Sequence, residues 1–325
     1  MTTRNIYFFD MKVTARGKFN RRDDPIDFNV KPKDISTIAE DIKQIFTGGD
    51  NLLQSGRNTD SPSHYLQDCQ VDDEKIVLLV NRCDPKAPDM VTSNPAEKEQ
   101  IVHAKPAGHG GDFSSHVVIM KNPVRGDNYY LCVIESLVGS GLSSTVIKSY
   151  LKSVLNKCRR EFKARYTIPD ISEPKVKVRH VHDIAFQGHP SESFMRDLEN
   201  GYLSGAQAIN YTGVGKHLDS NGAITEDYKT IKLKVDSSLI GDTVASLRAV
   251  RSKLMSEYKE YSELRIAFRT DGENKTAKLS IETGQLVDAD RYTKRHELKS
   301  IVTNQTSYAK ISSVILKEIM SYIGK

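Results

Sequence analysis

The sequence predicts an α+β protein of two mixed α/β domains, in which helices cover small sheets and a proline- and glycine-rich linker joins the domains. Three observations favour this class. With 325 residues, 38% of them hydrophobic, the chain is long enough to build two cores. Its last third follows the order strand, helix, strand, strand, helix. Prolines and glycines gather over residues 169–228, so we expect domains at 1–168 and 229–325.

The N-terminal half alternates predicted strands with two amphipathic helices. Apolar side chains predict an opening strand over Asn5–Val13. Asp34 is the expected N-cap of a helix that reaches Phe46, because isoleucines recur at helical spacing and two glycines follow. A second such helix begins at Ser143 or Ser144 and carries a basic block. Compact apolar runs predict three further strands, at Lys75–Asn81, Ser115–Lys121 and Asn128–Glu135.

Two segments of this sequence are rich in turn-forming residues. Asp84–Phe113 holds four prolines and three glycines, which predicts a loop or arm with a short helix at 95–103. The segment 169–228 is acidic and is predicted to be a linker that contains one helix, near Ser193–Asn200, followed by a glycine-rich stretch.

The C-terminal third returns to regular patterns. Thr230–Val235 predicts a strand, and Gly241–Tyr261 predicts a long helix. Two strands follow, with a turn expected at Asp271-Gly272 between them. The closing helix is predicted over Thr306–Tyr322, where apolar residues recur every three to four positions.

Charge is segregated along the chain, although the net charge is only +5. Residues 148–179 carry a net charge of +7 and residues 229–325 carry +6, whereas residues 1–147 and 180–228 carry −3 and −5. Two cationic blocks therefore flank an acidic one. Polyanions respond to such blocks, and phosphate backbones are the commonest polyanions in a cell.

The same sequence lacks the apolar segments that membranes and secretion require. Its longest apolar runs are far shorter than the roughly 20 residues of a membrane span, and no signal-type segment follows Met1. We therefore expect a cytoplasmic protein without direct membrane insertion. No paired spacing that predicts zinc ligands, a redox motif or a disulfide framework is found among the four cysteines, Cys69, Cys83, Cys132 and Cys158.

Several segments together resemble a known family. They are IKLKVDSSL at Ile231–Leu239, LRIAFRTDGENKTAKLSIETGQLVD at Leu264–Asp288, IVLLVNRCDP at Ile76–Pro85, FSSHVVIMKNPVRGDNYYLCVIE at Phe113–Glu135, the helix at Ser143–Lys157 and the closing helix from Ser307. In pattern and order they are similar to RexA-like phage-exclusion proteins and the DNA-binding subunit (KwaB-like) of the Kiwa anti-phage system. The chain departs from that pattern in its proline-rich segment 84–113 and its acidic segment 180–228.

That resemblance implies a DNA-binding protein with little sequence preference. It further implies a homodimer, a role in phage exclusion or anti-phage defence by abortive infection, and a membrane-protein partner.

Three groups of cations are the candidate DNA-binding residues, because lysine and arginine neutralise phosphates and release condensed counterions. The first group lies on and just after the basic helix: Lys148, Lys152, Arg159, Arg160, Lys163 and Arg165. The second lies on the strands of the last third: Lys232, Lys234, Arg265, Arg269, Lys275 and Lys278. The third lies before the closing helix: Arg291, Lys294 and Arg295.

Each group also has a plainer explanation. A basic helix face is often only solvated, and lysines on an edge strand prevent aggregation. A polar loop accounts for the third group equally well.

The alternative hypothesis is a metal-dependent nuclease or toxin-like effector of a defence system. His180 and His182 alternate as metal ligands on a strand do, and His189 follows. The carboxylates Glu135, Glu263 and Glu282 lie near predicted strand ends, the last of them close to Lys278. His109 lies in a glycine-rich loop where it could act as a general base.

None of these sets has a complete catalytic or metal-binding spacing, so we predict no catalytic residue, metal or cofactor. The sequence also shows no helix-turn-helix or zinc-finger pattern. It therefore favours a dimeric, sequence-tolerant double-stranded DNA-binding protein over an enzyme. A third hypothesis is an interaction subunit whose basic faces meet an acidic partner protein.

Overall fold

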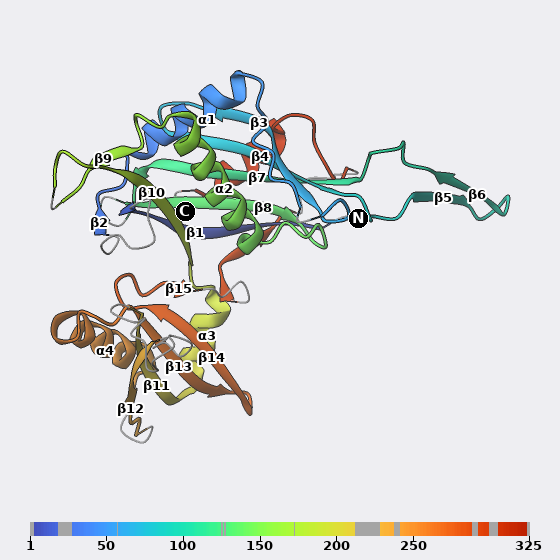
Figure 1. Ribbon diagram of the computed structural model, residues 1–325. Coiled ribbons are helices and arrows are strands. Elements are labelled where there is room, and N and C mark those ends of the chain that lie inside the picture. Colours follow the sequence, from blue (N-terminus) through green and yellow to red (C-terminus); the bar gives the residue numbers. More distant parts are fainter. Residues whose placement is uncertain are drawn as a thin grey trace, which may run out of the picture. The chain divides into compact units, whose positions relative to one another are not determined.

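The computed structural model describes residues 3–18, 28–56, 58–124, 126, 128–171, 173–211, 228–236, 241–287, 292–298 and 305–323 (Figure 1). It contains both helices and strands, but strand is the larger share at 44%, against 24% helix. In the described part of the chain, hydrogen bonds link fourteen strands into one antiparallel sheet. The prediction of two mixed domains with small helix-covered sheets is therefore wrong.

The error arises largely from two strands that lie inside the predicted linker. They are β10 (Lys177–Gly188) and β11 (Tyr202–Asn210). In β10 the alternate residues are buried, but two of them are histidines, His180 and His182, which hide the apolar alternation. In β11, one glycine and two alanines take the place of the branched residues that usually indicate a strand.

The chain divides into two compact units. Unit 1 comprises residues 1–7, 11–185 and 296–325, and unit 2 comprises residues 8–10 and 186–295. The boundaries expected after residues 168 and 228 do not coincide with these divisions. Unit 2 is instead an insertion, because unit 1 resumes after it and includes the closing helix, α5 (Ser313–Tyr322).

The strands that run through unit 1 are hydrogen-bonded in the order β10–β1–β8–β7–β4–β3. The long strands are β1 (Arg4–Lys18), β3 (Ser63–Val71), β4 (Lys75–Asp84), β7 (Gly111–Pro123) and β8 (Tyr129–Leu137). Three short strands pair at the side of this path: β2 (Phe28–Val30) and β16 (Arg295–Glu297) with β1, and β9 (Thr167–Pro169) with β10.

Two helices of unit 1 confirm the predicted caps. In α1 (Ile35–Thr47), the Asp34 carboxylate accepts a hydrogen bond from the Ser36 backbone N–H at 2.8 Å. In α2 (Ser144–Glu161), Ser143 is the N-cap, and apolar residues from Ile147 to Cys158 are buried. Apolar side chains of both helices line one small cavity with residues of β1, β4 and β7, so both helices pack on the sheet of unit 1.

A buried polar network ties the closing segment to this sheet. The Arg4 guanidinium donates to Glu135 Oε1 at 2.5 Å, and Glu135 Oε2 lies 2.8 Å from His116 Nδ1. The backbone N–H of Ser312 donates to His116 Nε2 at 3.0 Å. Arg4 also donates to the carbonyl of Gln305 at 3.0 Å. Residues 305–312 are thus held by the sheet, and α5 starts after them.

The predicted arm at 84–113 forms a hairpin and not the short helix expected at 95–103. Its strands are β5 (Met90–Asn94) and β6 (Glu99–His103), and every residue in both is exposed. Val91 lies opposite Val102 in this separate two-stranded sheet. Figure 1 shows the hairpin projecting away from the other strands of unit 1.

Unit 2 contains a four-stranded antiparallel layer with the order β12–β11–β13–β14, followed by the short strand β15 (Leu286–Val287). Its other strands are β12 (Lys229–Leu233), β13 (Glu263–Thr270) and β14 (Glu273–Ser280). Two helices, α3 (Glu192–Asn200) and α4 (Thr243–Glu257), complete it. The Ser191 hydroxyl accepts a hydrogen bond from the Phe194 backbone N–H and caps α3.

The core of unit 2 lies on one face of this layer. Leu264, Ile266 and Phe268 of β13 pack there with Phe194 of α3 and Leu247 of α4. Because side chains alternate along a strand, the residues between them point to the opposite face. That opposite face carries the candidate site.

Candidate nucleic-acid interface

The face of the unit 2 layer that points away from α3 and α4 carries cations in one cross-strand row. Strand register places Lys232 opposite Gln207, Gln207 opposite Arg265, and Arg265 opposite Lys278. With strands about 4.8 Å apart, the row from β12 to β14 spans about 14 Å. Three cations of the second predicted group therefore lie side by side, brought together by four strands.

A second row extends this face along the strands. Arg269 lies four residues from Arg265, which is about 13 Å in an extended strand, and it is opposite Tyr202 and Asn274. Lys234 is exposed just after β12. Between the two rows lie Gly205 and Ala267, which are small and keep the surface flat.

We call the five cations Lys232, Lys234, Arg265, Arg269 and Lys278 the cationic sheet face. In the part of the chain that the structure describes, none of the five is paired with a carboxylate. Arg269 donates only to the backbone carbonyl of Gly272, at 3.3 Å. The charge of this face is therefore available to an external anion.

The placement of these charges is unfavourable for the sheet itself. Arg265 and Lys278 are directly opposite each other on neighbouring strands, and like charges in that position destabilise a sheet. Protection of an edge strand accounts for Lys232 on β12, but not for Arg265 and Arg269, because β13 lies between β11 and β14.

Lys275 does not belong to this face. It is opposite Phe268, whose ring is in the core of unit 2, so it points to the helix side of the layer. Its ammonium lies 2.9 Å from Asp197 of α3, and this hydrogen bond raises the pKa of Lys275. Lys275 is thus a structural contact between β14 and α3.

Within the described residues, carboxylates pair with two of the six cations of the first predicted group, on and after α2. Lys152 lies 2.6 Å from Asp183, and Arg165 pairs with the buried carboxylate of Asp41. Lys157, in the same basic segment, lies 2.7 Å from Asp50. The partners come from α1, from the loop after α1 and from β10, so the fold offsets part of the charge excess that the sequence shows.

Of the remaining cations of that group, Lys148 lies near the start of α2, whereas Arg159, Arg160 and Lys163 lie at or just after its end. Burial together with the nearby charges of Arg179 and Arg160 lowers the pKa of Arg159, which places these three guanidinium groups close together. Arg160 and Lys163 are exposed, and Lys148 is half-buried. Arg159, Arg160, Lys163 and Arg179 thus make a smaller, secondary cationic cluster near the end of α2.

Of the third predicted group, the structure describes Lys294 and Arg295. Arg291 lies outside the described residues. The Lys294 ammonium lies 5.2 Å from the centre of the Phe8 ring, a cation–π contact. Arg295 is exposed at the start of β16.

The histidines of the nuclease hypothesis have a structural role. The rings of His180 and His182 lie 4.3 Å apart and are buried. His182 Nε2 accepts a hydrogen bond from the Lys33 backbone N–H at 2.9 Å, and His180 Nε2 lies 3.1 Å from the Lys31 carbonyl. The pair therefore fixes the segment that leads into α1.

The carboxylates of that hypothesis are divided between the two units. Glu135 is buried in unit 1 with Arg4 and His116, whereas Glu263 and Glu282 belong to unit 2. Over the residues for which side chains are described, no three His, Cys, Asp or Glu side chains form a group suited to a metal ion.

The buried histidines predict a loss of stability in weak acid. Burial, the neighbouring His180 and Lys33 lower the pKa of His182 from 6.5 to about 3. Between these values the unfolded chain binds a proton that the folded chain excludes, so His182 has no destabilising effect above pH 6.5 and a growing one below it. The slope is about 1.4 kcal/mol per pH unit.

Replacing His182→Gln keeps an acceptor for the Lys33 N–H but removes the titration. Urea unfolding at pH 7.5 and pH 5.0 should show that the variant loses about 2 kcal/mol less than the unchanged protein over this interval. Equal losses would show that His182 is protonated in the folded protein at pH 5.0.

No family model, curated protein or solved structure matches this chain. Among the described helices, none is both long and apolar enough to cross a membrane.

Sequence reasoning missed two residues of the interface. Tyr202 is 47% exposed beside Arg269, and Gln207 lies between Lys232 and Arg265. Both are on β11, which was expected to be part of a glycine-rich linker. The only signal for this strand is the weak alternation of Leu203, Ala206 and Ala208 on its buried face.

Proposed function

We propose that the protein is a sequence-tolerant DNA-binding protein, and that it holds the phosphate backbone of double-stranded DNA against the cationic sheet face of unit 2. The observation that carries this proposal is the row Lys232, Arg265, Lys278, in which like charges lie side by side with no carboxylate partner among the described residues. A bound polyanion offsets the repulsion that this row otherwise imposes.

The chemistry of the face supports little sequence preference. Contacts to phosphates fix the position of a protein on DNA but carry no sequence information. The face is flat at Gly205 and Ala267, and its long side chains are cations that suit phosphates. A role in phage exclusion or anti-phage defence, a homodimer and a membrane-protein partner rest on the sequence resemblance alone.

A salt titration tests this proposal. Fluorescence anisotropy would follow the binding of the full chain to two unrelated duplexes and to one single strand, at several NaCl concentrations. If all five cations of the face meet phosphates, the slope of log K against log salt is expected near −4.5, about 0.9 per contact. The two duplexes should bind equally.

Three results would contradict parts of the proposal. If the affinity did not depend on salt, phosphate binding would be ruled out. A large difference in affinity between the two duplexes would rule out sequence tolerance. If the single strand bound more tightly than the duplexes, single-stranded DNA and not double-stranded DNA would be the ligand.

A further inference from the structure

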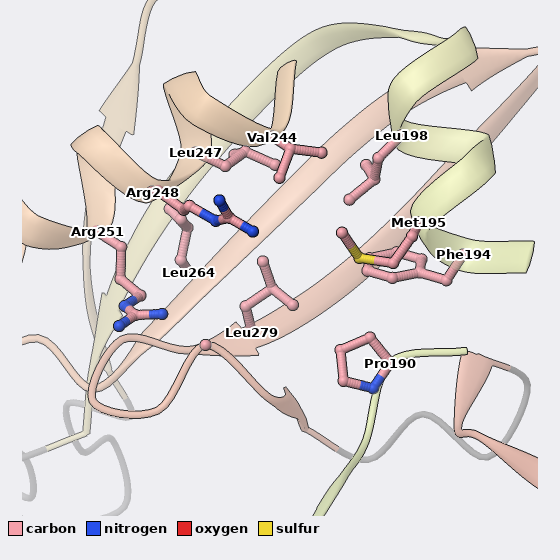
Figure 2. Close-up of a pocket in the computed structure, with 11 residues that line it drawn as sticks. Pro190, Phe194, Met195, Leu198, Val244, Leu247, Arg248, Arg251, Leu264 and Leu279 are labelled. Atoms are coloured by element: carbon pink, nitrogen blue, oxygen red, sulfur yellow. The ribbon is translucent and has the colours of Figure 1, made fainter. Parts of the chain in front are cut away.

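A cavity of about 210 Å³ lies within unit 2, on the helix side of the layer. Figure 2 shows α3 and α4 on its two sides, with Leu264 and Leu279 of the strands between them. The wall is apolar over most of its surface. Its other apolar residues are Pro190, Phe194, Met195, Leu198, Val244 and Leu247.

Two arginines of α4 complete the wall. In Figure 2 the guanidinium groups of Arg248 and Arg251 extend from the helix toward the cavity. Arg251 Nε is buried without a hydrogen-bond acceptor. Within the described residues, neither arginine is paired with a carboxylate. Arg251 is half-buried whereas Arg248 is exposed, so the buried Nε–H of Arg251 is the donor that an acceptor in the cavity would satisfy.

The Arg251 guanidinium lies close to Gly284, where a side chain would collide with it. A Cβ atom at Gly284 would lie 2.1 Å from Arg251 Nη1, and the backbone φ of +74° also favours glycine. The turn after β14 therefore leaves room for the guanidinium beside the cavity.

We propose that this cavity binds a small amphipathic carboxylate, whose apolar body fills the space between α3 and α4 and whose carboxylate pairs with Arg251 and Arg248. An apolar cavity of about 150 Å³ holds benzene, so this one accepts a single ring or a chain of roughly six to eight carbons. Arginine binds carboxylates in a two-pronged geometry. The site lies on the opposite face of the layer from the cationic sheet face, so its occupation does not depend on DNA binding.

Isothermal titration calorimetry of the full chain with three probes tests the chemistry. Octanoate has both the apolar chain and the anion, octanol has only the chain, and acetate has only the anion. We expect saturable binding of octanoate at one site per chain, octanol at least tenfold weaker, and no binding of acetate. Absence of saturable octanoate binding up to millimolar concentrations would overturn the proposal.

Variants locate the site. Arg251→Met keeps an unbranched apolar stem but removes the guanidinium, and it is expected to weaken octanoate binding at least tenfold, with less than a twofold effect on octanol binding. Leu279→Phe fills the cavity and should abolish the binding of both. Lys253→Met on the same helix is the matched control, because Lys253 pairs with Glu257 at the surface and does not line the cavity. Unchanged octanoate affinity in Arg251→Met, with the unfolding midpoint intact, would place the ligand elsewhere.

Discussion

Reversing three charges of the cationic sheet face, in a Lys232→Glu, Arg265→Glu and Lys278→Glu variant, is expected to weaken duplex binding roughly a hundredfold at physiological salt. Each lost phosphate contact removes about 0.9 condensed counterions from the binding equilibrium, which is roughly a fivefold loss in affinity at 0.15 M salt. The salt slope should also fall by about 3, and both duplexes should be affected alike.

The α2 surface of unit 1 offers a matched control. Lys152→Glu, Lys157→Glu and Lys163→Glu change the net charge by the same amount, but two of these lysines already pair with Asp183 and Asp50. We expect less than a tenfold loss of affinity from this variant. If the α2 variant lost more affinity than the sheet variant, the interface would lie on unit 1.

Replacing Glu135→Gln is expected to lower the free energy of unfolding by about 3–5 kcal/mol, because it leaves the buried Arg4 guanidinium without a counterion. The side chains of Arg4 and Glu135 are 1% and 0% exposed, so water cannot replace the lost partner. Urea unfolding at pH 7 measures the change. A loss below about 1 kcal/mol would show that Arg4 finds another partner in the variant.

Two further measurements separate the lost ion pair from a general packing defect. The double variant Arg4→Met, Glu135→Leu removes both charges and should recover at least about 1 kcal/mol of the loss. His116 and Arg4 lower the pKa of Glu135 against the effect of burial. The stabilisation by Glu135 is therefore fully present above the ordinary pKa near 4.3 and is lost as pH falls through the lower folded value. Glu135→Gln should show a smaller loss in acid.

Local patterns predicted the local structure. Asp34 and Ser143 cap the helices that they were expected to cap, because a cap and an apolar stripe are read within one or two turns. The turn at Asp271-Gly272 is confirmed, with φ of 51° and 79° at its two residues. That two-residue turn alone sets the register that places Arg265 opposite Lys278, and it also turns Lys275 toward the core.

Local sequence patterns could not predict the contacts between segments that are distant in the chain. The residues that neutralise α2, Asp41, Asp50 and Asp183, are ordinary polar positions in the sequence, and only the fold brings them to Lys152, Lys157 and Arg165. Insertion of β11 between β12 and β13 is equally nonlocal, because β11 precedes both in the chain. The same is true of the unit boundary, since residues 296–325 rejoin unit 1 after more than a hundred residues of unit 2.

The bond from Arg4 to the carbonyl of Gln305, 301 positions away, bears on how the newly made polypeptide matures. Domains generally fold as units while the ribosome is still adding residues, and the parts that emerge early wait for those that emerge late. Residues 186–295 are complete in the nascent chain before residue 305 has been added. The strand β1 must therefore wait until Gln305, 301 positions later, has been added before it meets these partners, and such distant pairings form slowly.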